Sequence, residues 1–390
     1  MNIAILIPSL GGGGAERAAQ LIGNYYVEKG NNVYFFLAEE KQDYPVKGKV
    51  IRTNIKRCME NEVSDLKRMF ILFRSSLEIR RLKKKYEIDI AISFMEEFNY
   101  LNVLSKGKER VITRVGTVIS QRDEFVGLLY KKSVVRFFYS RADKVIAVSQ
   151  DVLRDMYQYY RVPIKKLMRI PNMSIDFSDM DYDADWKFGN KAVLSIGRLM
   201  VVKQQERIIR AFSYVCRKEP EARLIILGKG PQLRYLKKTC ENLQIEDKVE
   251  FIGFTDKIAF YLKHAKVFVM ASRIEGFPNS MIEAMHYGVP IVSTDSLGGC
   301  GEIIGRPNRV ENVDSEMYCK YGILTPNIPG EKLKFGTRLA REEIVLGSAI
   351  LKVLTNNKVY QRYRRQSFRR AAMFSKEKIF KMWNQVLYEK

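Results

Sequence analysis

Apolar and polar residues alternate along the first part of the chain in the way that a parallel α/β domain requires. Residues 2–7 form a continuous apolar run of strand length, which a run of glycines at 11–14 ends. Between residues 15 and 30 the apolar positions recur at helical spacing, and residues 32–37 return to strand character. A strand, a glycine-rich turn, a helix and a strand in this order predict a βαβ unit with a buried parallel sheet. Further strands are predicted at 88–93, 111–114 and 144–148.

This pattern lapses between residues 171 and 190, where apolar residues are few and aspartates recur from Asp176 to Asp185. From residue 191 strands and helical stretches alternate again, which predicts a second doubly wound sheet. Its strands are predicted at 194–197, 223–227, 249–252, 267–270 and 289–293. We therefore expect one domain over 1–175, a second over 190–372, and a helical segment over 373–390 that is able to cross back to the first domain.

Length and composition fit this two-domain prediction. A chain of 390 residues suits two hydrophobic cores better than one, and an apolar content of 46% argues against global disorder. Two doubly wound domains would leave a ligand cleft between the carboxyl ends of their strands. We expect a reduced, cytoplasmic protein, because no uncharged run approaches the roughly 18 residues of a membrane span and the cysteines are odd in number and lack metal-ligand spacing. The cysteines are Cys58, Cys216, Cys240, Cys300 and Cys319.

The net charge of +23 is unevenly distributed along the chain. Residues 67–85 hold eight Lys and Arg against one acid, and residues 351–390 hold eleven against two. Such clusters are typical of nucleic-acid binding, of binding to an anionic membrane, or of a solvated face. Residues 66–85 combine large apolar side chains with the basic ones, as a helix lying in a membrane interface does. A core-packed helix with a charged outer face fits this stretch nearly as well.

Two segments could bind a phosphorylated ligand through backbone groups and cations. The glycine turn at 11–14 precedes a helix, so N–H groups and the helix dipole could approach an anion there, although a simple tight turn fits it as well. Gly197, Arg198 and Leu199 follow a predicted strand, with Lys203 close behind. A guanidinium and an ammonium at this place could clamp a diphosphate. Ordinary surface charge is the alternative interpretation in so basic a chain.

A third segment, 272–283, follows the predicted strand at 267–270 and opens a helix. Glu275 is expected in the turn and Glu283 in the helix, so their carboxylates could hold hydroxyl groups at two places on one ligand, such as a sugar and a ribose. Ser280 and Glu283 also have the spacing of a capping box, which would commit Glu283 to the helix start. A cap would explain neither Glu275 nor the Gly-Phe-Pro turn.

Together these segments resemble the retaining glycosyltransferases of family 4, a group with the two-domain GT-B fold in which two Rossmann-like domains face an interdomain cleft. The resemblance rests on residues 13–17, 197–204, 228–231 and 272–294, in matching order. It implies transfer of a hexosyl or N-acetylhexosaminyl group from a nucleotide diphosphate sugar, with UDP as the expected nucleotide. The implied acceptor is a saccharide or a polyprenyl-diphosphate-linked saccharide in cell-surface polysaccharide synthesis. The resemblance also implies that no metal or further cofactor is needed, and it favours peripheral association with the inner face of the cell membrane.

The resemblance assigns the site residue by residue. Glu275 would face the transferred sugar as the catalytic position, and Glu283 would hold the ribose. Arg198 and Lys203 would bind the donor diphosphate, assisted by the backbone of Gly14 from the other side of the cleft. The remaining donor-binding positions are Gly276, Phe277, Pro278, Asn279 and Ser280.

One feature departs from the family pattern. Many relatives place a histidine in the first domain, after the strand that corresponds here to 111–114, whereas the histidines of this chain are His264 and His286. We expect both to be structural. In a front-face retaining mechanism the leaving phosphate can take the acceptor proton, so the departure weakens the site assignment more than the activity.

Two other segments carry weaker signals. Residues 181–185 resemble a metal-binding DxD motif or the start of an EF-hand loop, but no strand precedes them and Trp186 replaces the required glycine. Residues 137–141 could stack nucleic-acid bases or form a buried helix face.

The alternative functions are a nucleotide-sugar epimerase of the same fold and a basic nucleic-acid-binding protein. The second lacks any sequence signature, so no nucleic-acid partner is expected.

Overall fold

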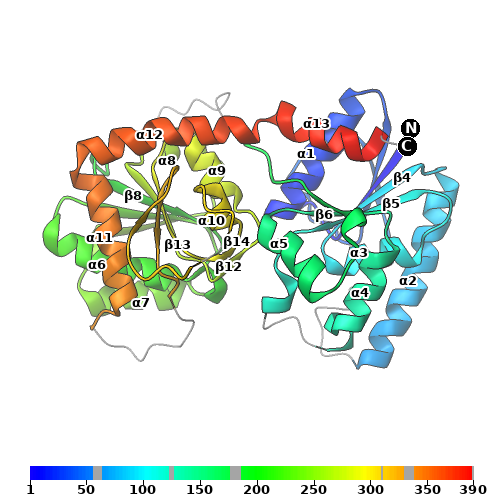
Figure 1. The fold of residues 1–390 in the computed structure, drawn as a ribbon, viewed down its shortest axis with the longest axis horizontal. Helices are drawn as coiled ribbons and strands as arrows, with labels where there is room; N and C mark the ends of the chain where they lie inside the picture. Colours follow the sequence, from blue (N-terminus) through cyan, green and yellow to red (C-terminus); the bar gives the residue numbers. More distant parts are fainter. Residues whose placement is uncertain (56–63, 123–126, 176–185, 309–310, 329–337, 389–390) are drawn as a thin grey trace. The chain divides into compact units, whose positions relative to one another are not determined.

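The computed structural model describes residues 1–55, 64–122, 127–175, 186–308, 311–328 and 338–388. The chain divides into two compact units, which are Met1–Asn172 with Phe380–Lys390 (unit 1) and Met173–Ile379 (unit 2). Each unit is an α/β body built around its own sheet (Figure 1). The predicted α/β fold with two doubly wound sheets is thereby confirmed. Cys58 and the Asp-rich segment 176–185 lie outside the described residues.

Unit 1 contains a 7-stranded sheet in the order β3-β2-β1-β4-β5-β6-β7, in which every neighbouring pair is parallel. The chain moves outward from β1 to β3 and then returns to the other side of β1 with β4, so the strand order reverses between β1 and β4. The strands are β1 (Asn2–Ile7), β2 (Asn32–Leu37), β3 (Lys49–Arg52), β4 (Ile90–Phe94), β5 (Arg110–Val115), β6 (Lys144–Ala147) and β7 (Leu167–Arg169).

Helices pack on this sheet, and the last one comes from the far end of the chain. The helix α13 runs beside α1 in Figure 1, where it is drawn in red and α1 in blue. Phe380 stacks on Tyr25 with ring centroids 3.7 Å apart, and Tyr26 Oη donates a hydrogen bond to Asn384 Oδ1 at 3.2 Å. The helices of unit 1 are α1 (Gly14–Glu28), α2 (Asp65–Lys85), α3 (Glu96–Leu104), α4 (Lys132–Arg141), α5 (Gln150–Arg154) and most of α13 (Lys376–Tyr388).

Unit 2 repeats the architecture with a 7-stranded sheet in the order β10-β9-β8-β11-β13-β16-β15. All of its pairs are parallel except β15 with β16, and the strand order reverses between β8 and β11. The strands are β8 (Ala192–Ile196), β9 (Arg223–Leu227), β10 (Val249–Gly253), β11 (Val267–Met270), β13 (Ile291–Thr294), β15 (Met317–Tyr318) and β16 (Ile323–Thr325). A separate pair joins β12 (Ile274–Glu275) to β14 (Leu297–Gly298). The helices are α6 (Gln205–Lys218), α7 (Leu233–Leu243), α8 (Ile258–His264), α9 (Asn279–His286), α10 (Gly299–Ile303), α11 (Arg341–Thr355) and α12 (Asn357–Ala371).

A buried ion-pair network joins α11 to α6 in the core of unit 2. Arg207 Nη1 and Arg210 Nε donate to the same oxygen of Glu343 at 2.9 and 2.8 Å, and all three side chains are buried. The second oxygen of Glu343 accepts the backbone N–H of Ala340 at 2.8 Å, at the start of α11. Glu343 therefore fixes both the packing and the beginning of α11.

We predict that Glu343→Gln destabilises unit 2 by about 3–5 kcal/mol, because it removes the negative charge that two buried guanidinium groups share. Chemical unfolding followed by circular dichroism measures the change. The control is Glu342→Gln, which removes the same charge from the neighbouring, less buried position and should shift stability by less than about 1 kcal/mol. Equal effects of the two substitutions would contradict the assignment.

Candidate functional site

The reversal of strand order between β8 and β11 marks the expected ligand position in unit 2. In open parallel sheets ligands bind beyond the carboxyl ends of the strands on either side of such a reversal. The segment after β8 contains Arg198 and Lys203, and the segment after β11 contains Glu275. The charged residues singled out in the second half of the sequence thus follow these two strands.

The loop after β8 is supported by the loop after β9. Leu199 N donates to Lys229 O at 3.0 Å, and Gln232 N donates to Leu199 O at 3.1 Å. Gly228 has a φ of +139°, and a Cβ there would lie 2.0 Å from the carbonyl oxygen of Gly197. Only glycine allows this approach, so the backbone on both sides of Arg198 is fixed while its side chain remains exposed.

Lys203 and Glu275 form a direct contact. Lys203 ends a short 3-10 turn, Val201–Lys203, and its Nζ donates to Glu275 Oε1 at 2.5 Å. Both side chains are largely but not fully buried. A backbone bond from Arg273 N to Val202 O, 2.9 Å long, joins the same two segments. The structure therefore brings together two of the predicted site residues that lie far apart in the sequence.

Glu275 is held by a short strand rather than by the turn that the sequence suggested. It is the second residue of β12 and pairs with Gly298 of β14. Gly298 has a φ of +109°, and a Cβ on it would lie 1.5 Å from the carbonyl oxygen of Glu275. A Cβ on Gly299 would lie 2.7 Å from the carbonyl oxygen of Gly276. The sequence motifs did not include Gly298 or Gly299. A Gly-Gly pair just beyond the strand at 291–294 is nevertheless a signal of close backbone approach.

The helix α9 begins directly after this loop. Its first residue is Asn279, its N-cap is Pro278, and no side chain caps it. The capping-box interpretation of Ser280 and Glu283 is therefore wrong, because the helix begins one residue before Ser280 and the N-cap position belongs to a proline. Glu283 is buried within α9, and the N–H groups of the first turn lie next to the Glu275 loop.

The remaining predicted positions differ in their exposure and in the unit to which they belong. Gly276, Phe277 and Pro278 are buried, whereas Asn279 and Ser280 are partly exposed at the start of α9. The ring of Phe277 packs edge-on against Phe374 at 5.2 Å. Gly14 lies in unit 1, where it is the exposed first residue of α1.

Both histidines make structural contacts in unit 2. His264 Nδ1 lies 2.7 Å from Phe260 O, and its ring stacks on Trp186 at 4.8 Å. His286 Nδ1 lies 3.2 Å from Ser174 Oγ. Within the described ranges no group of His, Cys, Asp and Glu is arranged to hold a metal ion. The DxD-like residues 181–185 are outside those ranges.

Comparison with known proteins identifies two matching families. The family described as "Glycosyltransferase Family 4" matches residues 12–173, and that described as "Glycosyl transferases group 1" matches residues 181–309. An uncharacterized glycosyltransferase of Methanocaldococcus jannaschii is 27% identical over 360 residues, which are 87% of this chain and 88% of that protein. An N-acetylgalactosaminyltransferase of Campylobacter jejuni, which acts on N-acetylgalactosamine-N,N'-diacetylbacillosaminyl-diphospho-undecaprenol, is 27% identical over 312 residues, 78% of this chain and 83% of the relative.

Solved structures share the fold. The sucrose-phosphate synthase of Thermosynechococcus elongatus superposes with a TM-score of 0.77 at 18% identity, covering 100% of this chain and 98% of that one. The Anabaena protein HepE, in complex with UDP and glucose, superposes with a TM-score of 0.74 at 17% identity over 100% of both chains.

We predict that Gly298→Ala destabilises unit 2 by more than its backbone conformation alone requires. Gly189, which has a φ of +66° and no atom within 4 Å of the place a Cβ would take, is the matched control. Gly189→Ala should cost about 1–2 kcal/mol for the left-handed backbone, and Gly298→Ala clearly more, because β14 must move away from β12. Thermal unfolding of both variants measures the difference, and equal midpoints would contradict the close approach.

Proposed function

The chain belongs to the GT-B glycosyltransferases with a family 4 and a group 1 domain, and on that premise we propose that it transfers a hexosyl or N-acetylhexosaminyl group with retention. The proposed donor is a UDP sugar, and the proposed acceptor is a saccharide or a lipid-linked saccharide used in cell-surface polysaccharide synthesis. The retaining outcome follows from the resemblance to family 4. The diphospho-undecaprenol-linked substrate of the Campylobacter transferase supports the proposed acceptor, and the UDP in the Anabaena complex supports the proposed nucleotide.

The contact between Lys203 and Glu275 carries the donor half of this proposal. Each group neutralises the other while no diphosphate is bound. A diphosphate offers Lys203 a stronger anionic partner, with Arg198 on the adjoining loop as a second cation. The Glu275 carboxylate then becomes available to the hydroxyl groups of the donor sugar. With two cations and the start of α9 near the phosphates, the site neutralises the diphosphate without a metal ion.

We predict that Lys203→Ala weakens donor binding and that Glu275→Ala abolishes transfer. A panel of nucleotide sugars is tested for protection against thermal unfolding, since a ligand at 100 times its dissociation constant adds about 2.7 kcal/mol. Lys218→Ala is the control, because it removes an exposed lysine at the end of α6. It should leave both donor protection and transfer unchanged.

Two results would contradict parts of this proposal. The first is ordinary turnover by Glu275→Ala, which would overturn the assignment of Glu275. The second is isomerisation of the donor sugar in the absence of any acceptor, which would favour the nucleotide-sugar epimerase.

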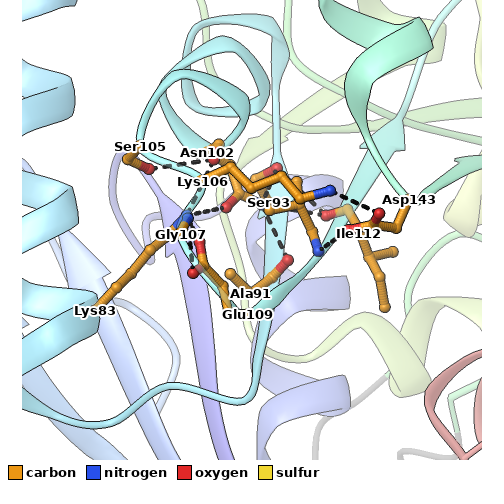
Figure 2. Close-up of polar contacts among 11 residues, drawn as sticks. Lys83, Ala91, Ser93, Asn102, Ser105, Lys106, Gly107, Glu109, Ile112 and Asp143 are labelled. Atoms are coloured by element: carbon orange, nitrogen blue, oxygen red, sulfur yellow. Dashed lines mark hydrogen bonds and ion pairs between the residues drawn. The ribbon is translucent and has the colours of Figure 1, made fainter.

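Within unit 1, the helix α2 has two different faces. Its inward face is fixed by Lys83, whose Nζ donates to Glu109 Oε1 and Asn102 Oδ1, both at 2.7 Å (Figure 2). Burial lowers the pKa of Lys83 to about 8, and the contact with Glu109 opposes this shift. The rest of the inward face consists of Leu72, Ser75, Ser76 and Ile79.

The outward face of α2 carries a stripe of large apolar side chains. Leu66 is 84% exposed, Phe70 64% and Phe73 59%, and Met69 and Leu77 extend the stripe. These residues recur at the spacing of one helix face, and exposed basic residues flank them. The flanking cations are Lys67, Arg74, Arg80, Arg81, Lys84 and Lys85.

None of the described helices is long and apolar enough to cross a membrane. We therefore propose that this face lies in the surface of an anionic membrane, as expected for an enzyme with a lipid-linked acceptor.

We predict that the double substitution Phe70→Ser and Phe73→Ser abolishes flotation with vesicles of phosphatidylcholine and phosphatidylglycerol. Phe254→Ser in unit 2 is the control, because Phe254 is equally exposed at 61% but lies outside α2. Wild-type binding should weaken with added salt, since each cation contributes about 1 kcal/mol near an anionic leaflet. Absence of wild-type binding at low salt would remove the membrane proposal and leave the transferase proposal intact.

A further inference from the structure

The reversal of strand order in unit 1 marks a second ligand position, on a sheet of its own. The order reverses between β1 and β4, so a ligand is expected beyond the carboxyl ends of these strands. The glycine turn at 11–14 follows β1, and Glu96 follows β4 as the first residue of α3. A carboxylate thus stands at the reversal point in each unit, Glu275 in unit 2 and Glu96 in unit 1.

The residue between β4 and Glu96 has an unusual backbone conformation. Met95 has a φ of +68°, which non-glycine residues seldom adopt. Such a conformation costs on the order of 1–3 kcal/mol and persists only where the surroundings enforce it. It makes the chain turn sharply from β4 into α3, which places Glu96 directly at the end of the strand.

A network of buried amides holds α3 in this position. Asn99 accepts a hydrogen bond from Ser93 Oγ at 2.8 Å and donates to Arg114 O at 3.0 Å, so it links α3 to β4 and β5. One turn later Asn102 Nδ2 donates to Ala91 O at 3.0 Å and Asn102 Oδ1 accepts from Lys83, as Figure 2 shows. The first turn of α3 is therefore rigidly tied to the sheet, and Glu96 is positioned before any ligand arrives.

Glu96 is partly exposed at the start of α3, and its surroundings differ from those of Glu109 and Glu343, which anchor helices in the core. Glu109 and Glu343 each contact a cation within 3 Å, whereas no lysine or arginine in the described part of the chain forms an ion pair with Glu96. It interacts electrostatically with the phenols of Tyr100 on α3, Tyr139 on α4 and Tyr160 after α5, and with the guanidinium of Arg122. Burial raises the pKa of the Glu96 carboxyl, and a hydrogen bond from its own backbone N–H and the charge of Arg122 oppose this shift. A desolvated carboxylate without a cation destabilises the fold, and such groups concentrate at functional sites.

We infer that Glu96 accepts a hydrogen bond from a non-reacting hydroxyl group of the acceptor sugar and so selects the acceptor. This inference rests on the proposed transferase function. A sugar hydroxyl suits the site because it is a neutral donor, which can add a hydrogen bond to the one from the Glu96 backbone N–H without needing a counter-charge. Hydrogen bonds to a charged partner contribute about 1.5–3 kcal/mol, which corresponds to roughly 10- to 150-fold in affinity.

The test compares acceptors that differ by one hydroxyl group. Octyl glycosides of glucose, galactose and their 2-acetamido forms are assayed with UDP sugars, followed by the monodeoxy analogues of the best acceptor. Wild type should lose roughly 10- to 100-fold in kcat/KM when one particular hydroxyl is removed. Glu96→Gln should show the same loss with the complete acceptor and little further loss with that deoxy analogue.

Three comparisons separate this role from a structural one. Protection against unfolding by the donor should be unchanged in Glu96→Gln, because the donor site lies in unit 2. Acceptor KM of the wild type should rise as the pH falls through the raised pKa of Glu96, since a protonated carboxyl no longer accepts the bond, and Glu96→Gln should lack this dependence. Glu40→Gln, which removes an exposed carboxylate after β2, should behave as wild type.

Each outcome bears on one proposal. Ordinary acceptor KM in Glu96→Gln, or an equal sensitivity of wild type and variant to every deoxy analogue, would overturn the role of Glu96 alone. Failure of the wild type to transfer any sugar to any octyl glycoside would overturn the proposed function itself. If Glu96→Gln does not fold, Glu96→Asp provides the comparison, and it should bind the acceptor more weakly while keeping the pH dependence.

Discussion

The organisation of unit 2 around its sheet reversal brings Lys203 and Glu275 together in an ion pair. This ion pair joins the segments after β8 and β11, which lie 72 residues apart in the sequence. Its partners are themselves fixed by close backbone approaches, at Gly228 on one side and at Gly298 on the other. A diphosphate that binds Lys203 would therefore release the Glu275 carboxylate, while the surrounding backbone would not need to rearrange. Electrostatic groups held in this way require little reorganisation when a charged ligand arrives.

Buried charge elsewhere in the molecule serves packing. Glu109 pairs with Lys83 beneath α2, and Glu343 pairs with Arg207 and Arg210 beneath α11. Basic residues outnumber acidic ones in this chain, whose net charge is +23. Each of these two buried acids holds a helix to the rest of its unit. Glu96 has no such ion pair in the described structure, and we propose for it a role in binding rather than in packing.

Sequence patterns predicted the inner strands of the unit 1 sheet and, apart from β16, those of the unit 2 sheet, because those strands are continuous apolar runs. The pattern missed β3, β7 and β15, which have few buried side chains and lie at or near sheet edges, and it missed β16, which spans only three residues.

Arg198, Lys203 and Glu275 were found because local motifs contain them, and the structure brings Lys203 and Glu275 together. Gly298 and Glu96 were not found, because the close approach of the Gly298 backbone and the lack of an ion pair at Glu96 depend on the folded structure, which no local spacing encodes. The capping box failed because Ser280 lies inside the first turn of α9.

The return of α13 to unit 1 has a consequence for how the protein is made. Phe380 and Asn384 complete the packing around Tyr25 and Tyr26, although about 350 residues of synthesis separate the two segments. During translation, unit 1 leaves the ribosome first but lacks these partners until the last helix has emerged. Unit 1 therefore begins to be synthesised before unit 2, but it reaches its fully packed state only after unit 2 and α13 have been synthesised.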